Sequence, residues 1–340
     1  MSNKVNSRVL NFLTYFFISF CGITIIVNLF WSTVKKTSSK SKSSLPSLYV
    51  SKNTIRRSDT DETIQLKGVT TMTFDYDNLD SQTLIDRLKI AKTWRINLLG
   101  IFISPFQIQN RWGELDKVVE WTKNNHIYIY LMPAINIHNK NHSYADQLAQ
   151  LDNISKTIAV RYAKYSHILY GLWAEPSGLP WISLVSIFNH SANELRKYNT
   201  KAIVLLTGAQ FGRFVTKDDK LTVENAIFDI HDYPWANPEN ARILKMKNPV
   251  GILWDKIYKD LPVLIGEFGG VYKEDFGSKE DLYYIKFVLK EVNKKKLNYS
   301  AYTIDSEGEL GLMNWDNKTP TNKGKLILDD LKKFPPTNFD

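Results

Sequence analysis

The sequence predicts an α/β fold in which about eight parallel strands alternate with helices and close into a barrel. Apolar, strand-like runs alternate with amphipathic, helix-like runs from Thr63 to the end of the 340-residue chain. Two of the apolar runs lead into a glutamate, and a barrel of parallel strands places functional groups at strand ends. No GxGxxG or GxxxxGKS/T motif follows any strand, which argues against a doubly wound open sheet, the runner-up. The prediction is therefore a (β/α)8 TIM barrel.

The N-terminal residues are predicted to form a membrane anchor. Val9 to Trp31 is an uncharged apolar run of about the length that spans a bilayer. It lacks the shorter apolar core and small-x-small cleavage site of a secretory signal, so we expect it to remain uncleaved. A buried helix of the soluble fold is the alternative. Residues 32–62 are rich in Ser and Lys and are predicted to be a flexible linker, which leaves residues 63–340 for the barrel.

The strand-like runs of the barrel follow one another at regular spacing, with a helix-like run after most of them. The expected strands are Lys67 to Phe74, Asn97 to Ile103, Ile127 to Met132, a run ending at Glu175, Ala202 to Thr207, Ala226 to His231, a run ending at Glu267, and Tyr299 to Ile304. The expected helices are Leu84 to Trp94, Leu115 to Lys123, Gln147 to Tyr165, Trp181 to Tyr198, Leu282 to Asn293 and Lys323 to Lys332.

Two glutamates are the candidate catalytic residues. Glu267 lies in LPVLIGEFGG and Glu175 in HILYGLWAEP, each after a continuous apolar run. Taken alone, either one is readily explained as a loop residue or a helix cap. As a pair at the ends of parallel strands, they supply the two carboxyl groups that glycoside hydrolysis needs, one as general acid and one as nucleophile or base.

Both segments resemble clan A glycoside hydrolases, most nearly the family 5 cellulase-like enzymes. In that family an N-E-P segment on strand four carries the acid/base, and a G-E-F-G segment on strand seven carries the nucleophile. The resemblance, which covers roughly Gly68 to Leu331, implies that Glu175 is the acid/base and Glu267 the nucleophile. His231 and Tyr233 in FDIHDYPW are similar to the family's His-x-Tyr. This implies that the tyrosine hydroxyl bonds to the nucleophile and that the histidine lines the sugar site.

The sequence departs from the family pattern at three positions. Ala174 stands where an asparagine usually contacts the substrate 2-hydroxyl, and Gly100 stands at the nearest match to an arginine beside the nucleophile. Ile304 stands where strand eight usually ends in a tryptophan under the bound sugar. Loss of the 2-hydroxyl contact at Ala174 suggests a slow enzyme or an unusual sugar. The tryptophans near strand ends or loops that can supply stacking instead are Trp112, Trp173, Trp235 and Trp315.

The charge distribution and the cysteine and histidine content bear on whether the protein binds nucleic acid or a metal. Residues 1–60 hold nine basic residues and one acidic residue, whereas the other 280 hold 35 basic and 34 acidic residues. Eight of the nine net positive charges thus belong to the N-terminal region, and the charge gives no reason to expect nucleic acid as a partner. Cys21 is the sole cysteine, and the six histidines include no HExxH; His138 and His142 form only a weak ligand pair. We therefore expect no metal and no cofactor.

These observations predict a membrane-anchored retaining β-glycoside hydrolase that acts on a β-linked polysaccharide or oligosaccharide. The alternatives are a barrel that has lost turnover and binds glycans, and a barrel with unrelated chemistry. The lysines after Val9 to Trp31 favour a cytoplasmic barrel by charge, but polysaccharides lie mostly outside the cell, so we expect an extracytoplasmic one. We also expect carboxyl groups about 5 Å apart, with Glu267 ionised and Glu175 protonated at rest. The oligomeric state stays open.

Overall fold

The computed structural model describes residues 45–75, 78–135, 144–213, 215, 220–233, 258–269, 279–305 and 311–339. The predicted anchor from Val9 to Trp31, residues 32–44 of the predicted linker, and Trp235 lie outside these ranges. Within them, no helix combines the length and the apolar character that crossing a membrane requires.

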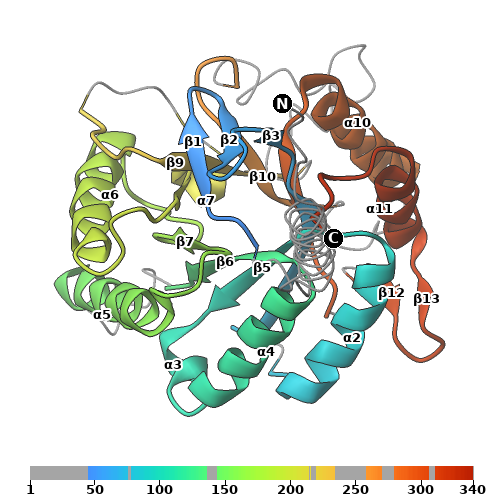
Figure 1. The fold of residues 1–340 in the computed structure, drawn as a ribbon, viewed down its shortest axis with the longest axis horizontal. Helices are drawn as coiled ribbons and strands as arrows, with labels where there is room; N and C mark the ends of the chain where they lie inside the picture. The colour runs from blue at the N-terminus through green and yellow to red at the C-terminus, as the bar shows by residue number, and fades with distance from the viewer. Residues whose placement is uncertain are drawn as a thin grey trace, which may run out of the picture. The chain divides into compact units, whose positions relative to one another are not determined.

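Eight parallel strands form a closed barrel in the order β10-β11-β4-β5-β6-β7-β8-β9, which confirms the predicted TIM barrel. Helices surround this barrel (Figure 1). The barrel strands are β4 (Lys67–Phe74), β5 (Leu98–Ile103), β6 (Tyr128–Pro133), β7 (Ile168–Gly171), β8 (Val204–Thr207), β9 (Ala226–Asp232), β10 (Val263–Phe268) and β11 (Asn298–Ala301). The helices are α2 (Ser81–Thr93), α3 (Pro105–Ile108), α4 (Trp112–Asn124), α5 (Tyr144–Tyr162), α6 (Trp181–Arg196), α7 (Ala209–Gly212), α10 (Lys279–Lys295) and α11 (Asn322–Lys333). A small hairpin, β12 (Met313–Asn314) with β13 (Thr319–Pro320), precedes α11.

The barrel strands are buried on both faces, as their continuous apolar runs predict. In β6, Tyr128 and Tyr130 belong to one apolar cluster, while Ile129 and Leu131 belong to a second that includes the helices. This alternation follows from the two-residue period of a strand, which sends successive side chains to the barrel interior and to the helix layer. Side-chain caps fix two of the helix starts: Asp80 accepts from two backbone amides at the start of α2, and Thr321 accepts from one at the start of α11.

The prediction of a flexible linker is wrong for residues 45–62. Here the chain forms an antiparallel sheet of β1 (Leu48–Ser51), β2 (Thr54–Arg57) and β3 (Thr63–Ile64). Leu48, Ile55 and Ile64 are buried and join the apolar cluster inside the barrel. The many serines and lysines concealed these widely spaced apolar residues. Because burying them removes apolar area from water, this short segment is held against the barrel.

Hydrogen bonds attach this N-terminal sheet to the barrel at the end where the strands begin. The Tyr128 hydroxyl donates to the Pro46 carbonyl at 2.5 Å, and the Ser166 hydroxyl donates to the Leu45 carbonyl at 2.8 Å. The Val50 amide donates to Asn225 Oδ1 at 2.7 Å. We call this closed end of the barrel the floor, and the opposite end, where the strands finish, the mouth.

A buried lysine cluster lies beside the floor, between the barrel and the last two helices. Lys67 begins β4 and is fully buried. Its Nζ donates to Asn293 Oδ1 at 2.6 Å and to the Phe334 carbonyl at 2.8 Å, and it lies 3.4 Å from Asp330 Oδ2. Tyr299 also donates to Asp330, at 3.0 Å. Each charge therefore has several partners, which offset the cost of removing it from water.

Candidate active site

Glu267 lies inside β10, at the mouth. Its strand pairs with β9, and the register between the two strands shifts between Ile265 and Glu267. The Glu267 side chain is only 7% exposed. Its Oε2 accepts a hydrogen bond from the Tyr233 hydroxyl at 3.0 Å, which is the contact that the family resemblance implies. A buried carboxyl group held by a fixed donor has a defined orientation, so Glu267 presents its other oxygen in one direction.

Glu175 reaches the mouth from a loop rather than from a strand end. The strand before it, β7, ends at Gly171, earlier than the sequence predicts. Glu175 itself has φ = 45°, in the left-handed region that residues with a side chain seldom adopt. Such a conformation costs about 1–3 kcal/mol and persists where the surrounding structure enforces it. The loop is tied down on both sides, because the Ala174 amide donates to the Pro133 carbonyl and the Phe211 amide to the Pro176 carbonyl.

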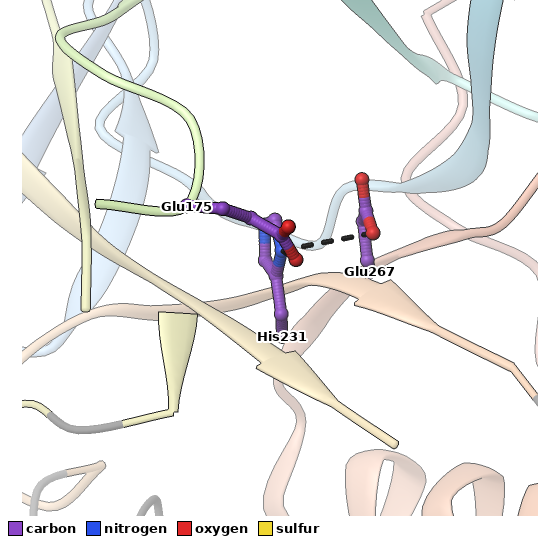
Figure 2. Close-up of side chains that lie close together, drawn as sticks. All are labelled: Glu175, His231 and Glu267. Atoms are coloured by element: carbon purple, nitrogen blue, oxygen red, sulfur yellow. Dashed lines mark hydrogen bonds and ion pairs between the residues drawn. The ribbon is translucent and has the colours of Figure 1, made fainter. Parts of the chain in front are cut away.

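His231, near the end of β9, lies between the two glutamates (Figure 2). Its Nδ1 is 2.8 Å from Glu175 Oε1 and 3.6 Å from Glu267 Oε2. One oxygen of each carboxyl group and one ring nitrogen all lie within 4.8 Å of one another. The His231 side chain is only 1% exposed, which leaves little of the ring for the direct sugar contact that the resemblance implies. It instead underlies the two carboxyl groups.

The opposite ring nitrogen of His231 faces a third acidic residue, Asp229, which the sequence analysis did not single out. Nε2 lies 3.2 Å from Asp229 Oδ2, and the same oxygen accepts from the Thr207 hydroxyl at 2.8 Å. Asp229 is fully buried in β9. The signal that could have found it is its position two residues before His231, since residues i and i+2 of a strand share one face.

Burial and neighbouring charges determine the protonation of this cluster. Burial raises the pKa of Glu267 to about 8, and nearby Glu175 adds to the rise, whereas His231 and the Tyr233 hydroxyl oppose it. Burial alone would lower the pKa of His231, but Glu267, Asp229 and Glu175 together raise it well above its ordinary value. Burial therefore opposes the ionised form of Glu267 that the sequence predicts. Tyr233 does donate to it, but the loss of solvation is the larger effect.

Glu175, His231 and Glu267 are also a set of side chains that can surround a metal ion, since each offers a ligand atom in the same small volume. A metal requires a free lone pair on a neutral imidazole. Here each ring nitrogen of His231 faces a carboxyl group, at 2.8 Å for Glu175 and 3.2 Å for Asp229. This arrangement favours the imidazolium, which has no lone pair to give. The donor set thus fits a hydrogen-bonded acid and base cluster better than a metal site.

An aromatic residue does follow strand eight, but it is Tyr302 rather than a residue at Ile304. Ile304 is fully buried, whereas Tyr302 directly follows β11 and is partly exposed. The Tyr302 ring lies edge-on to Tyr233, with centroids 6.3 Å apart, and its amide donates to the Phe268 carbonyl. Tyr302 therefore lies one aromatic ring away from Glu267. The sequence analysis missed it because it extended strand eight past Ala301.

The remaining positions singled out from the sequence are Gly100 and the four tryptophans. Gly100 lies within β5, where an added Cβ would be 2.2 Å from the Tyr130 hydroxyl, so tyrosine occupies the space that a longer side chain there would need. Trp173 is 1% exposed and donates to the Ile135 carbonyl, which excludes it as a stacking surface. Trp112 and Trp315 pack against arginines, Arg161 and Arg87 respectively. Trp235 lies outside the described residues.

The family model for cellulase, glycosyl hydrolase family 5, matches residues 57–308. The chain belongs to this family. As a member of glycosyl hydrolase family 5, it is a glycosidase. The match begins inside β2 and covers the segments of both glutamates, of His231 and of Tyr233.

Solved structures of family 5 enzymes share the fold. The β-glucanase SdGluc5_26A from Saccharophagus degradans is 18% identical, with a TM-score of 0.70 over 86% of this chain and 94% of that one. The catalytic domain of endoglucanase Cel5A from Thermobifida fusca is 14% identical, with a TM-score of 0.68 over 85% and 98%. Endoglucanase Cel5A from Thermotoga maritima is 17% identical, with a TM-score of 0.61 over 78% and 96%. A search of curated protein sequences finds no match.

Proposed function

We propose that this protein is a retaining β-glycosidase that cleaves a β-linked glucan. The observation that carries the proposal is the pair of glutamates at the barrel mouth, with an oxygen of each inside a 4.8 Å cluster. Retaining glycosidases have carboxyl groups about 5–5.5 Å apart, whereas inverting enzymes need about 6.5–9.5 Å to admit a water molecule. Two carboxyl oxygens within 4.8 Å of each other support the closer arrangement, that of a retaining enzyme.

In the first step, an oxygen of Glu267 attacks the anomeric carbon and forms a covalent glycosyl ester. Glu175 donates its proton to the glycosidic oxygen, and the leaving sugar departs with that proton. In the second step, Glu175 takes a proton from water, whose oxygen attacks the anomeric carbon and releases Glu267. The sugar keeps its β configuration because the anomeric carbon is inverted twice. The assignment of roles follows the family pattern of each segment rather than the resting position of the proton.

The raised pKa of Glu267 has a consequence for this mechanism. Attack requires the carboxylate, yet burial favours the protonated form up to about pH 8. For the free enzyme, kcat/KM should therefore rise with pH through the neutral range, because kcat/KM reports the ionisation of groups in the unliganded site. His231 and Tyr233 limit the rise in the pKa of Glu267, since both stabilise the charged carboxylate.

Tyr302 is the proposed platform for the sugar that undergoes cleavage. Aromatic faces suit the apolar faces of pyranose rings, and Tyr302 adjoins Tyr233, the residue bonded to Glu267. A tyrosine offers less stacking area than the tryptophan that the resemblance implies. We therefore expect weaker binding of the cleaved sugar, with KM rather than kcat affected most.

The proposed substrate class is based on the oligosaccharides bound in structures of similar enzymes. The structure of SdGluc5_26A was solved with cellotetraose, and that of Thermotoga maritima Cel5A with mannotriose. The first favours a β-glucan for this chain, and the second makes β-mannan the substrate to test against it. Because loop shapes around the mouth set this choice, fold alone does not decide it.

A glycan-binding barrel without turnover is the second candidate. Ala174 and Gly100, which lack the side chains usual at those positions, and the handicap of a protonated Glu267 are the observations that favour it. The two candidates differ in one measurement. A binding protein retains an oligosaccharide intact, whereas a glycosidase releases new reducing ends.

We further propose that Val9 to Trp31 anchors the protein in a membrane with the barrel outside the cytoplasm. The support is the length of this uncharged run and the extracellular location of most structural polysaccharides. Protease treatment of intact cells tests the orientation. Digestion of the barrel in intact cells supports an outside location, and protection until lysis contradicts it.

The decisive experiment is hydrolysis of β-glucans and β-mannan by the fragment from Leu45 to Asp340. The fragment should begin at Leu45, because β1 to β3 belong to the same compact unit as the barrel. Proton NMR during the first minutes identifies the anomer that forms. β product from a glucan supports the proposal, α product indicates inversion, and binding without new reducing ends favours the second candidate.

A further inference from the structure

Asp229 has no direct contact with the two glutamates among the interactions that the structure describes, yet it is tied closely to the residue between them. Its Oδ2 contacts His231 Nε2, and Thr207 donates to the same oxygen. Its Oδ1 accepts no hydrogen bond from the described residues, although the side chain is fully buried. A buried carboxylate with one oxygen lacking a donor is costly, on the order of 1–3 kcal/mol or more. Packing alone would be satisfied by an apolar residue at this position.

Two glycines make room for the Asp229 and His231 pair. A Cβ added at Gly266, the residue before Glu267, would lie 1.6 Å from Asp229 Oδ1. A Cβ at Gly212, the last residue of α7, would lie 2.7 Å from His231 Cγ, and Gly212 also has φ = 78°. The backbone of β10 and of α7 therefore presses against the pair. The ring of His231 and the carboxylate of Asp229 are confined to one arrangement.

We propose that Asp229 is a positioning residue that acts through His231: it fixes the imidazolium so that Nδ1 points at Glu175 and Glu267. The inference rests on the proposed catalytic role of these glutamates. In the part of the chain that the structure describes, the ion pairs of Glu175 and Glu267 are formed with His231 and not with a lysine or arginine. Asp229 thus secures the one cation that faces both carboxyl groups there.

The groups around His231 determine whether removing the charge of Asp229 raises or lowers the pKa of Glu267. The charged or titratable groups that face this cluster come from three strands and from the segments that follow β7 and β9. They are Tyr130 on β6, Glu175 after β7, Asp229 on β9, Tyr233 after β9, and Glu267 on β10. Among the influences on the pKa of Glu267, the lowering by His231 ranks second after burial, whereas the direct raising by Asp229 ranks last of those resolved. Removing the charge of Asp229 should therefore act mainly by discharging His231, and the pKa of Glu267 should rise.

The test is the pH profile of kcat/KM for Asp229→Asn in the full chain, with a nitrophenyl β-glucoside as the probe. Asparagine keeps the shape but removes the charge. We expect the acidic limb of the profile to move about one unit toward higher pH, with an approximately ten-fold loss at pH 6 and a much smaller loss near pH 9. A uniform loss at every pH, with the limb unmoved, would show that Asp229 has only a structural role.

A milder variant covers the case in which Asp229→Asn does not fold. Thr207→Val removes one donor to Asp229 Oδ2 without changing any group that contacts the glutamates. It should shift the limb in the same direction by about one-third of a unit, a two-fold loss at pH 6. Thr122→Val is the matched control, since Thr122 is a buried threonine beside another buried histidine, His167, away from the mouth. An unmoved limb in Thr207→Val, equal to that of the control, overturns the inference.

A second measurement separates this inference from the proposed function. NMR of the labelled histidine rings follows the protonation of His231 without any need for turnover, with His231→Asn to assign its signal. In the wild type the ring should stay protonated well above its ordinary pKa, and in Asp229→Asn it should lose its proton at lower pH. A chain that hydrolyses no glycoside but shows this difference removes the proposed function alone. Identical titrations in both proteins contradict the inference whether or not the chain is active.

Discussion

The barrel buries charges at both of its ends, but it satisfies them to different degrees. Beside the floor, Lys67 has two hydrogen-bond acceptors and an ion pair with Asp330, which itself receives further donors. At the mouth, His231 is confined among three acidic side chains, and one of these, Asp229, has an oxygen with no donor among the described residues. The two clusters illustrate two roles that buried charges have in this barrel. A fully partnered cluster stabilises the fold, whereas an incompletely partnered one keeps groups whose protonation can change.

The largest expected effect is on turnover, at the mouth. Glu267→Ala should reduce hydrolysis of every substrate by at least about 10⁴-fold, because no covalent intermediate can form. Removing a buried carboxyl group of raised pKa should at the same time leave the unfolding midpoint near neutral pH unchanged or higher. Steady-state kinetics and urea unfolding of the same sample measure the two effects. Appreciable activity in this variant would contradict the assignment of Glu267.

Glu175→Ala should lose about 10²–10⁴-fold on polysaccharides, which is the usual contribution of general acid catalysis. It should keep measurable glycosylation of nitrophenyl glycosides, whose leaving group needs little acid assistance. Added azide should speed breakdown of the intermediate and yield a β-glycosyl azide, which product NMR identifies. Azide rescue of Glu267→Ala to an α-azide supports the same roles, and the two products exchanged between the variants would reverse them. Glu120→Ala, which removes a surface carboxylate of α4, is the control.

A substitution at the floor should lower stability and leave turnover unchanged. Lys67→Met leaves Asp330 buried without its cation, so we expect a loss of about 3–5 kcal/mol in the free energy of unfolding. kcat at a temperature well below the melting point should stay unchanged. Urea unfolding measures the loss, and the double variant Lys67→Met with Asp330→Leu should recover part of it. A loss below about 1 kcal/mol would mean that the pair contributes little, as exposed pairs do.

The free energy of unfolding should depend on pH mainly through Glu267 and His231 at the mouth. Folded Glu267, with a pKa of about 8, retains a proton that the unfolded chain has lost above its ordinary pKa of 4.5. The folded state thus binds more protons between these values, so stability falls as pH rises from about 5 to 8. His231, whose pKa is also raised, adds to the same slope above its ordinary value.

Glu267→Gln tests this dependence, because glutamine has no proton to lose. The variant should remove about 2–4 kcal/mol of the decline between pH 5 and pH 8. Urea unfolding at several pH values compares the two proteins. Parallel curves for variant and wild type would place the pH dependence elsewhere in the molecule.

Substitution of Tyr233 should lower activity less than removal of either glutamate. Tyr233→Phe removes the hydroxyl that donates to Glu267, a hydrogen bond to a charged group worth about 1.5–3 kcal/mol. Activity at pH 7 should fall about 10- to 100-fold, with the acidic limb moved upward, since this bond lowers the pKa of Glu267. Tyr162→Phe, which removes a hydroxyl bonded to Asp116 in the helix layer, should leave activity unchanged. Equal behaviour of the two variants would remove Tyr233 from the machinery.

The sequence was most informative where side-chain periodicity is strong. The barrel strands are buried on both faces, so their apolar runs identify them, and β4 begins and ends at the predicted residues. Within the site, the position of Glu267 in β10 and its contact with Tyr233 follow the expected pattern. A local motif carries such information because neighbouring parallel strands bring their ends together.

Sequence reasoning was weaker where distant residues determine the outcome. It did not anticipate the raised pKa of Glu267, because desolvation depends on everything packed around a carboxyl group. It missed Asp229, whose importance lies in a ring nitrogen of His231 and a hydroxyl of Thr207 on another strand. It missed the N-terminal sheet as well, since three separated apolar residues in a polar segment show no clear period until the barrel interior receives them.

The attachment of both ends of the compact unit at the floor bears on how the chain is made. Thr337 accepts from Gln65 and from Asn97, and Phe339 packs edge-on against Tyr128. During synthesis on a ribosome, β1 to β3 emerge before the barrel strands, yet the surface that they share with Thr337 and Phe339 is completed only after these much later residues have been made. Closure then joins segments far apart in the chain, a type of contact that slows folding. The neighbouring ends also make this barrel suitable for circular permutation, with a new start opened in an exposed loop.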